Sequence, residues 1–433
     1  MSRTRLKAPV ALILASSALA LLLVEITGRL LIKPYLGWYG AWFGVPLPPM
    51  SLVFEPVNEE QNRAAWYEGL VVDGRHITLG DVAGYHRYDA ILGYATLENT
   101  VSVNGWWHSN EIGARETEST PLQPAAGQSR WLLVGESFAH GTGVQTAQTW
   151  AEIADRAAAD LDIVNLSVAG YSMAQAYLRY LSVADRLQHD GVLLAFAPTV
   201  DLWREVNTIR ELGEPWGLHT VMPRFVLEGD GLRLVSSPYA DADTFRRENE
   251  NGLSPTLEDH LRRYDRLYFP LEHRPVAGLD RLLTYKLVVA AYGRYARGRV
   301  RREQLRSGSE GLEVSRRLFR RLQNEAVQRG KKFTVLILPT ISDLRRLHAD
   351  SSFRETWRRI ASYACGAVSR CIDLGSPLAD MPPEVIDVSV DGNHYGARMN
   401  ERIAREVLAA LGLSSLGETE ITRTSPARRP SPQ

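Results

Sequence analysis

Short apolar runs alternate with amphipathic segments over most of the chain beyond residue 128. The apolar runs predict five buried strands, at 131–135, 162–167, 192–197, 333–338 and 371–374. Between them, apolar positions spaced three and four residues apart predict helices at 149–160, 173–188, 311–328, 353–368 and 397–411. Strands that alternate with helices are typical of a parallel sheet wrapped by helices. The pattern therefore predicts an α/β fold class.

Three other parts of the chain lack this alternation. Residues 34–128 are rich in Gly, Pro, Trp and Asn and predict an irregular, partly β lead-in to the α/β domain, which spans 129–413. Residues 203–308 are predicted to be an insertion in that domain, and they contain a β-hairpin at 224–235 around a Gly-Asp-Gly turn. Residues 414–433 have little to bury, which predicts a disordered tail.

The insertion ends in a long predicted helix that is crowded with arginines. A run of charge of this kind usually marks a solvated helix face. A site for an anionic glycan or a lipid headgroup is the alternative interpretation. The basic residues are Arg294, Arg297, Arg299, Arg301, Arg302 and Arg306.

The chain begins with a basic cluster followed by an uncharged apolar stretch. Arg3, Arg5 and Lys7 precede residues 8–24, which carry no charge. This pattern is typical of a membrane-inserted segment whose basic end stays in the cytoplasm. We therefore expect residues 1–33 to form a cytoplasmic end and a single transmembrane signal-anchor, with the remaining domain on the periplasmic or extracytoplasmic side.

A cleaved signal peptide is the alternative for this segment. Ala18-Leu19-Ala20 resembles a cleavage site, but the apolar stretch continues past it through residues 21–24. Both interpretations export the protein.

Composition limits the classes of partner and cofactor. Fifty basic residues balance fifty acidic ones to give a net charge of 0, so nothing global favours a nucleic acid or a strongly acidic partner. The sequence has no zinc-ligand spacing and no glycine-rich phosphate loop, so we expect no metal and no cofactor. Cys365 and Cys371 are either a small disulfide formed in an oxidising compartment or two free buried thiols.

Residues with catalytic chemistry follow the predicted strands. In an open α/β sheet, ligands bind at the carboxyl ends of the strands. Ser137 follows the first strand in a glycine-rich turn, Gly170 follows the second, and Asp391 and His394 lie near the end of the chain. A serine nucleophile needs an imidazole to take its proton, and the imidazole needs a carboxylate to orient it. The sequence therefore predicts one pocket that contains a nucleophile, a base and an orienting acid.

These motifs resemble the GDSL or SGNH hydrolase family, in particular its membrane-anchored bacterial branch. The similarity covers roughly residues 88–412 and includes a match at 110–115. It implies a flavodoxin-like, three-layer αβα fold with a five-stranded parallel sheet, here preceded by a transmembrane helix and carrying the insertion.

The resemblance also implies the roles of the site residues. Ser137 is the expected nucleophile, His394 the general base and later the acid, and Asp391 the residue that orients His394. The N–H groups of Ser137 and Gly170 are the expected oxyanion donors.

Two positions depart from the family pattern. Glu136 replaces the usual aspartate beside the nucleophile, and Val200 stands where the family has an oxyanion-hole asparagine. Valine cannot donate a hydrogen bond, and the loss of one oxyanion donor lowers the rate by about 10²- to 10³-fold. Thr199 and Asn207 are candidate substitutes. His140, one helical turn beyond Ser137, is a candidate pocket residue, with a packing or surface role as the alternative.

The residues and the resemblance together predict an exported, membrane-anchored serine esterase or acyl hydrolase that works through an acyl-enzyme. Its expected substrate is an ester or acylated carbohydrate, such as an O-acetylated envelope or extracellular polysaccharide, with the acyl group passed to water or to a sugar hydroxyl. A non-catalytic glycan-binding or assembly protein is the first alternative, which Val200 favours. A lipase or thioesterase that acts on membrane lipids is the second. For this protein we expect the substrate and the membrane as partners, and we expect no nucleic acid.

Overall fold

The architecture is described from a computed structural model of the chain. The structure describes residues 7–35, 39–42, 45–50, 71–72, 75–76, 85–102, 104–209 and 220–413. The predicted cytoplasmic residues before Lys7 and the predicted disordered tail at 414–433 lie outside the described residues.

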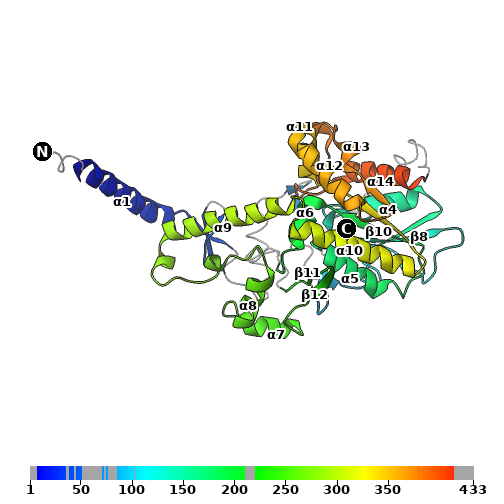
Figure 1. Cartoon of the computed structure of the whole chain (residues 1–433), viewed down its shortest axis with the longest axis horizontal. Coiled ribbons are helices and arrows are strands. Elements are labelled where there is room, and N and C mark those ends of the chain that lie inside the picture. Colours follow the sequence, from blue (N-terminus) through cyan, green and yellow to red (C-terminus); the bar gives the residue numbers. More distant parts are fainter. Residues whose placement is uncertain are drawn as a thin grey trace, which may run out of the picture.

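A five-stranded parallel sheet forms the centre of the α/β domain (Figure 1). Its strands lie in the order β14-β13-β10-β8-β9, and every neighbouring pair is parallel. This order is that of a doubly wound fold of the flavodoxin type. The strands are β8 (Ser129–Val134), β9 (Leu161–Asn165), β10 (Gly191–Phe196), β13 (Lys332–Ile337) and β14 (Cys371–Asp373). All five strands predicted from the sequence are therefore confirmed.

Two layers of helices bury the two faces of the sheet. On β10, Val192 and Leu194 belong to one buried cluster and Leu193 and Ala195 to the other, as strand alternation requires. Helices α5, α10 and α12 cover the first face, and α4, α11 and α14 cover the second. These helices are α4 (Trp150–Ala157), α5 (Met173–Val183), α10 (Glu310–Gln328), α11 (Ile341–Ala349), α12 (Ser351–Cys365) and α14 (Ala397–Leu411).

Polar side chains fix where several of these helices begin. The hydroxyls of Thr149, Ser172 and Ser309 each accept a hydrogen bond from a backbone N–H in the first turn of α4, α5 and α10. Such caps satisfy N–H groups that have no acceptor inside the helix.

The lead-in contains short antiparallel pairs, as its composition predicts. Strands β6 (His86–Asp89) and β7 (Gly93–Thr96) form a hairpin that packs on the α/β domain. The Tyr94 hydroxyl donates to Ala169 O at 2.7 Å, and the Tyr171 hydroxyl donates to Tyr94 O at 2.7 Å. The other short strands are β1 (Ile32–Tyr35), β2 (Tyr39–Trp42), β3 (Val45–Pro46), β4 (Val71–Val72) and β5 (Arg75–His76).

The insertion contains the predicted hairpin and a long helix. Strands β11 (Arg224–Glu228) and β12 (Gly231–Val235) pair in antiparallel register, which confirms the hairpin. The helices are α7 (Ala242–Asn249), α8 (Pro255–Tyr264) and the arginine-rich α9 (Leu283–Gln304).

Helix α1 (Lys7–Arg29) extends away from the α/β domain and meets the start of α9 (Figure 1). Glu25 Oε1 accepts a hydrogen bond from Leu283 N at 2.8 Å, and its Oε2 accepts one from Thr284 N at 3.1 Å. The side chains of α1 are mostly exposed; Leu12, for example, is 71% exposed. Among the described residues, no helix has the length and hydropathy that a membrane crossing requires. The transmembrane anchor stays a prediction.

Cys365 and Cys371 form a disulfide between the end of α12 and the start of β14. Of the two interpretations of this pair, the bonded one is found. Disulfides persist in oxidising compartments and are rare in the cytosol.

We expect the double variant Cys365→Ser/Cys371→Ser to lower the free energy of unfolding by about 2 kcal/mol, because the bond restricts a short loop in the unfolded chain. Urea unfolding of the two proteins measures the difference. The wild type in excess reductant should match the double variant. Identical midpoints for the oxidised wild type and the variant would contradict a closed bond.

Candidate active site

Ser137 lies at the carboxyl end of a central strand. β8 ends at Val134, and the short helix α3 (Ser137–His140) follows it. Glu136 caps this helix: its Oε2 accepts hydrogen bonds from Phe138 N at 2.8 Å and from Ser137 Oγ at 2.9 Å. Because β8 lies between β9 and β10, its carboxyl end is the point where the strand order reverses, which is where open α/β sheets bind ligands.

The turn after β9 brings Gly170 to the same edge. Val168 N donates to Gly135 O at 3.2 Å, which joins this turn to the turn that carries Ser137. Gly170 has a φ of +82°, and a Cβ at this position would lie 2.6 Å from the Tyr94 hydroxyl oxygen. Glycine is therefore required here both by the backbone conformation and by the close approach of Tyr94.

Asp391 and His394 form a pair in the segment between α13 (Gly375–Leu378) and α14. His394 Nδ1 lies 2.6 Å from Asp391 Oδ2. Asp391 Oδ1 accepts further hydrogen bonds from Ser389 Oγ at 2.6 Å, Asn393 N at 2.9 Å and His394 N at 3.1 Å.

Burial acts to raise the pKa of Asp391, but its hydrogen bonds and the adjacent imidazole outweigh burial and hold that pKa well below its usual range. Asp391 is therefore an ionised carboxylate. It fixes the orientation of the His394 ring and leaves Nε2 available for proton transfer.

The Asp391–His394 pair packs against the turn that carries Ser137. The ring centroids of Phe138 and His394 are 4.8 Å apart. In the loop after α3, a Cβ on Gly143 would lie 2.6 Å from Ser389 Oγ and 3.2 Å from Asp391 Oδ2. Folding therefore brings the predicted nucleophile and the predicted base to one edge of the sheet.

In this geometry, however, the Ser137 hydroxyl donates to Glu136. Among the described residues, no hydrogen bond joins Ser137 to His394. Catalytic hydrogen bonds are often long in the absence of substrate and tighten when it binds. The structure thus shows the Ser137 hydroxyl bonded to Glu136.

Thr199 and Asn207 have partners away from this pair. Thr199 lies in α6 (Pro198–Arg204), and its Oγ1 donates to Asp343 Oδ2 of α11 at 2.7 Å. Asn207 is buried, and its Nδ2 donates to Asp265 Oδ2 in the insertion at 2.9 Å. Each residue thus donates to a carboxylate, and a role for either as the substitute oxyanion donor stays a prediction.

His140 is fully buried beneath the serine turn. Its ring centroid lies 4.7 Å from that of Trp107, and its Nδ1 lies 3.1 Å from Thr142 Oγ1. Burial, followed by the charge of Arg115, holds the pKa of His140 well below its ordinary value, so the ring is neutral. The structure therefore gives His140 the packing role and not the pocket role.

Two arginines near the site have no role predicted from the sequence. Arg115 is buried; its Nη2 donates to Val144 O at 2.7 Å, and its guanidinium carbon lies 5.3 Å from the centroid of the Trp107 ring. Burial lowers the pKa of Arg115 to about 10. Arg204 Nη1 donates to Tyr171 O, next to Gly170, at 3.0 Å. The match at 110–115 is the sequence signal that points to Arg115, whereas the sequence offers no comparable signal for Arg204.

Two buried carboxyl groups, Glu136 and Asp201, interact beside Ser137. Asp201 Oδ2 accepts a hydrogen bond from Ala197 N at 2.7 Å. Asp201 Oδ1 and Glu136 Oε1 have no hydrogen-bond partner in the described part of the chain, and Arg204 Nη1 is 3.7 Å from Asp201 Oδ1. Burial, and after it the charge of Glu136, raises the pKa of Asp201 well above its ordinary value.

The raised pKa of Asp201 predicts how stability depends on pH. The folded protein binds more protons than the unfolded chain between the unfolded pKa, about 3.9, and the higher folded pKa, so stability falls as pH rises through that interval. Asp201→Asn keeps an oxygen for Ala197 N and cannot ionise. We therefore expect its free energy of unfolding to exceed that of the wild type at about pH 8, with the difference shrinking toward about pH 4.

Urea unfolding at a series of pH values measures this difference. The exposed Asp160→Asn is the matched control and should follow the wild type at every pH. A difference between Asp201→Asn and the wild type that stays constant with pH would show that Asp201 does not titrate in this interval.

No known protein-family profile and no curated protein matches the chain. Solved structures do resemble it. A member of the lipolytic G-D-S-L family from Veillonella parvula is 11% identical over 65% of this chain and 97% of its own, with a TM-score of 0.31. TesA is 12% identical over 65% and 98%, with a TM-score of 0.34. An α/β hydrolase from the metagenome of Lake Arreo, Spain, is 14% identical over 66% and 96%, with a TM-score of 0.32. The solved structures similar to this chain thus include lipolytic G-D-S-L proteins, the family that the Ser137, Gly170 and Asp391–His394 motifs resemble.

Proposed function

We propose that the protein is a serine esterase or acyl hydrolase whose nucleophile is Ser137. The observation that carries the proposal is the position of His394: Asp391 orients its ring, and the ring packs on Phe138, the residue next to Ser137. The two partners that a serine nucleophile needs are therefore held against the turn that presents it.

In the proposed reaction, the Ser137 hydroxyl turns from Glu136 to His394 Nε2. As Oγ bonds to the acyl carbon, its proton passes to Nε2, and Asp391 stabilises the imidazolium. The N–H groups of Ser137 and Gly170 stabilise the negative charge on the carbonyl oxygen. The alcohol leaves with the proton from Nε2. Water, or a sugar hydroxyl, then attacks the acyl-enzyme with His394 as base and releases Ser137.

We further propose that this chemistry takes place outside the cytoplasm on an O-acetylated polysaccharide, with α1 as the tether. The Cys365–Cys371 disulfide supports an oxidising compartment. The exposed aliphatic side chains of α1 support contact with lipid.

Hydrolysis of 4-nitrophenyl acetate and of an acetylated oligosaccharide tests the nucleophile. We expect Ser137→Ala to lower kcat by at least about 10³-fold and to abolish labelling by a fluorophosphonate probe, because the acyl-enzyme cannot form. Ser351→Ala removes an exposed serine and should leave both measurements unchanged. Equal activity of Ser137→Ala and the wild type would rule out Ser137 as the nucleophile. A strong preference for long acyl chains would favour the lipase or thioesterase alternative.

A non-catalytic glycan-binding protein is the second candidate function. Val200 lacks the donor that the family pattern places there, and its side chain packs against an apolar cluster. Thr199 and Asn207, the two nearby donors, bond to carboxylates. This candidate predicts acetylated-glycan binding without turnover.

Val200→Asn distinguishes these two functions. An added oxyanion donor should raise kcat by about tenfold or more, toward the 10²- to 10³-fold that such a donor contributes. Val200→Ala, which removes the valine side chain without adding a donor, is the control and should not raise kcat. If the wild type is active and Val200→Asn leaves turnover unchanged, another group already acts as the oxyanion donor. Arg204, which lies beside Gly170, is the first candidate to examine.

A further inference from the structure

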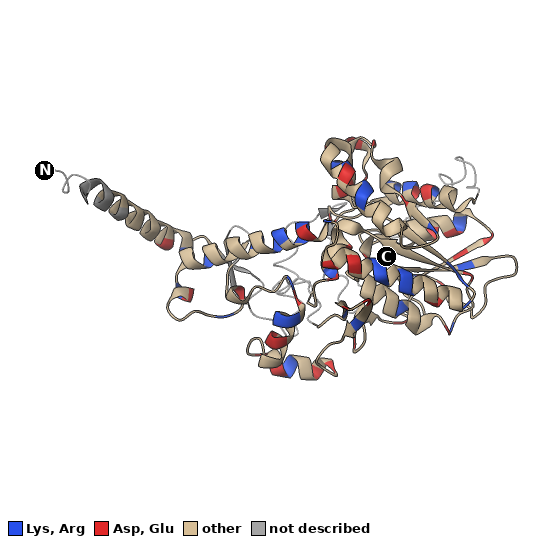
Figure 2. Cartoon of the chain, viewed as in Figure 1, with Lys and Arg blue, Asp and Glu red and all other residues tan. Residues whose placement is uncertain are grey.

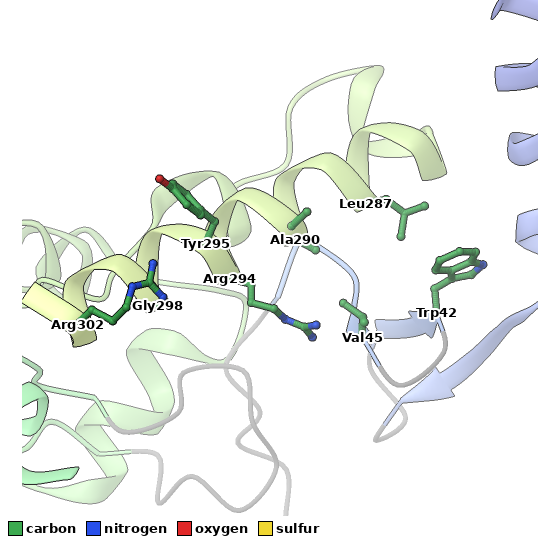
Figure 3. Close-up of a pocket in the computed structure, with 9 residues that line it drawn as sticks. Trp42, Val45, Leu287, Ala290, Arg294, Tyr295, Gly298 and Arg302 are labelled. Carbon is green, nitrogen blue, oxygen red and sulfur yellow. The ribbon is translucent and has the colours of Figure 1, made fainter. Parts of the chain in front are cut away.

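A pocket lies between α9 and the β2–β3 hairpin, and none of the candidate active-site residues line it (Figure 3). Its volume is about 500 Å³. Trp42 and Val45 line it from the hairpin, and Leu287 lines it from the first half of α9. Arg294 and Arg302 line it farther along the same helix. The pocket is therefore apolar at the hairpin end, with Arg294 directed toward Val45 and Arg302 at the far end (Figure 3).

The two arginines that line this pocket differ from other arginines of α9. Arg297 forms an ion pair with Glu272, and Arg299 Nε lies 2.7 Å from Glu303 Oε1. Within the part of the chain that the structure describes, Arg294 and Arg302 form no ion pair with a carboxylate. Two unpaired guanidinium groups at the rim of an apolar pocket favour an anionic ligand, because a guanidinium binds phosphate and carboxylate groups in a fixed geometry.

The surface around the pocket is apolar and exposed. On α9, Val288 is 67% exposed and Tyr292 is 56% exposed. Helix α1 meets the start of α9 through Glu25, and residues 8–24 of α1 carry no charge. In the coloured part of α1 in Figure 2, charge lies only near this junction. Exposed apolar side chains gathered at one end of a molecule mark a protein or membrane contact, and Tyr and Trp are the side chains that favour a lipid–water boundary.

We propose that this pocket binds one anionic membrane lipid. Its acyl chain lies against Trp42, Val45 and Leu287, and its phosphate lies between Arg294 and Arg302. The apolar lining selects an amphiphile over a soluble anion, and the two cations select an anionic lipid over a zwitterionic one. α9 also reaches α6, since the Arg301 guanidinium lies 4.3 Å from the centroid of the Trp203 ring. A bound lipid therefore sets the distance and tilt of the candidate active site relative to the membrane.

Lipid titration of the full-length protein in detergent tests the charge half of the proposal, with bound lipid counted by native mass spectrometry. We expect dioleoyl phosphatidylglycerol to bind at least about tenfold more tightly than dioleoyl phosphatidylcholine. Arg294→Gln/Arg302→Gln should remove this preference. The matched control Arg299→Gln/Arg306→Gln makes the same change of charge beyond the pocket lining and should retain it. If both double variants lose the preference for phosphatidylglycerol equally, the lipid is attracted by the overall charge of the helix and not held in the pocket. That result would overturn the proposal.

Two tryptophan substitutions on α9 test the apolar half of the proposal. Ala291 lines the pocket and is exposed, so Ala291→Trp fills the pocket without entering the core. Val288→Trp adds the same bulk on the same helix at a position outside the lining. We expect loss of phosphatidylglycerol binding only in Ala291→Trp, with the thermal melting of both variants as the folding check. Unchanged binding in Ala291→Trp, or displacement of phosphatidylglycerol by inorganic phosphate, would overturn the proposal of a lipid.

Discussion

Close backbone approach at the carboxyl edge of the sheet is the constraint on which the candidate active site depends. A Cβ on Gly135 would lie 2.8 Å from Ala195 Cβ of the neighbouring strand, and a Cβ on Gly143 would lie 2.6 Å from Ser389 Oγ. A Cβ on Gly170 would meet the Tyr94 hydroxyl. The first two contacts join the segments around Ser137 to β10 and to the Asp391–His394 segment, and the third joins the turn after β9 to the lead-in hairpin. Residues far apart in the chain share one edge because three glycines allow their segments to touch.

The sequence predicts the sheet well because its information is local. Buried parallel strands are short apolar runs bounded by turn residues, and all five occur within two residues of their predicted ends. The Asp391–His394 pair is predictable for the same reason, since both residues lie in one short turn. The partners of Thr199, Asn207 and His140 are not local. They are Asp343, Asp265 and Trp107, which come from α11, the insertion and the lead-in, and no spacing rule links them to the site.

Buried titratable groups lie on two sides of the serine turn. Arg115 lies beneath the loop after α3, where a backbone carbonyl and an aromatic ring replace the carboxylate that a buried guanidinium usually has. Asp201 and Glu136 lie on the side of α6. Burial of charged groups lowers the stability of the folded state, and strongly shifted pKa values gather where a site needs fixed electrostatic groups. Burying the Arg115 guanidinium therefore costs folding free energy, and Arg115 and Glu136 bond to the segments on either side of Ser137.

The hydrogen bond from Ser137 to Glu136 must break before Ser137 can act as the proposed nucleophile. Glu136 has one methylene more than the family's aspartate, and its single oxygen Oε2 accepts from both Phe138 N and Ser137 Oγ. A typical hydrogen bond contributes a net of about 0.5–1.5 kcal/mol, so leaving it unreplaced would slow the proposed reaction by about 2- to 10-fold. A new hydrogen bond from the Ser137 hydroxyl to His394 offsets this cost only where the imidazole ring is fixed in place. The three hydrogen bonds to Asp391 Oδ1 and the packing on Phe138 fix it, so the proposed reaction depends on the order of the Asp391–His394 segment as well as on Ser137.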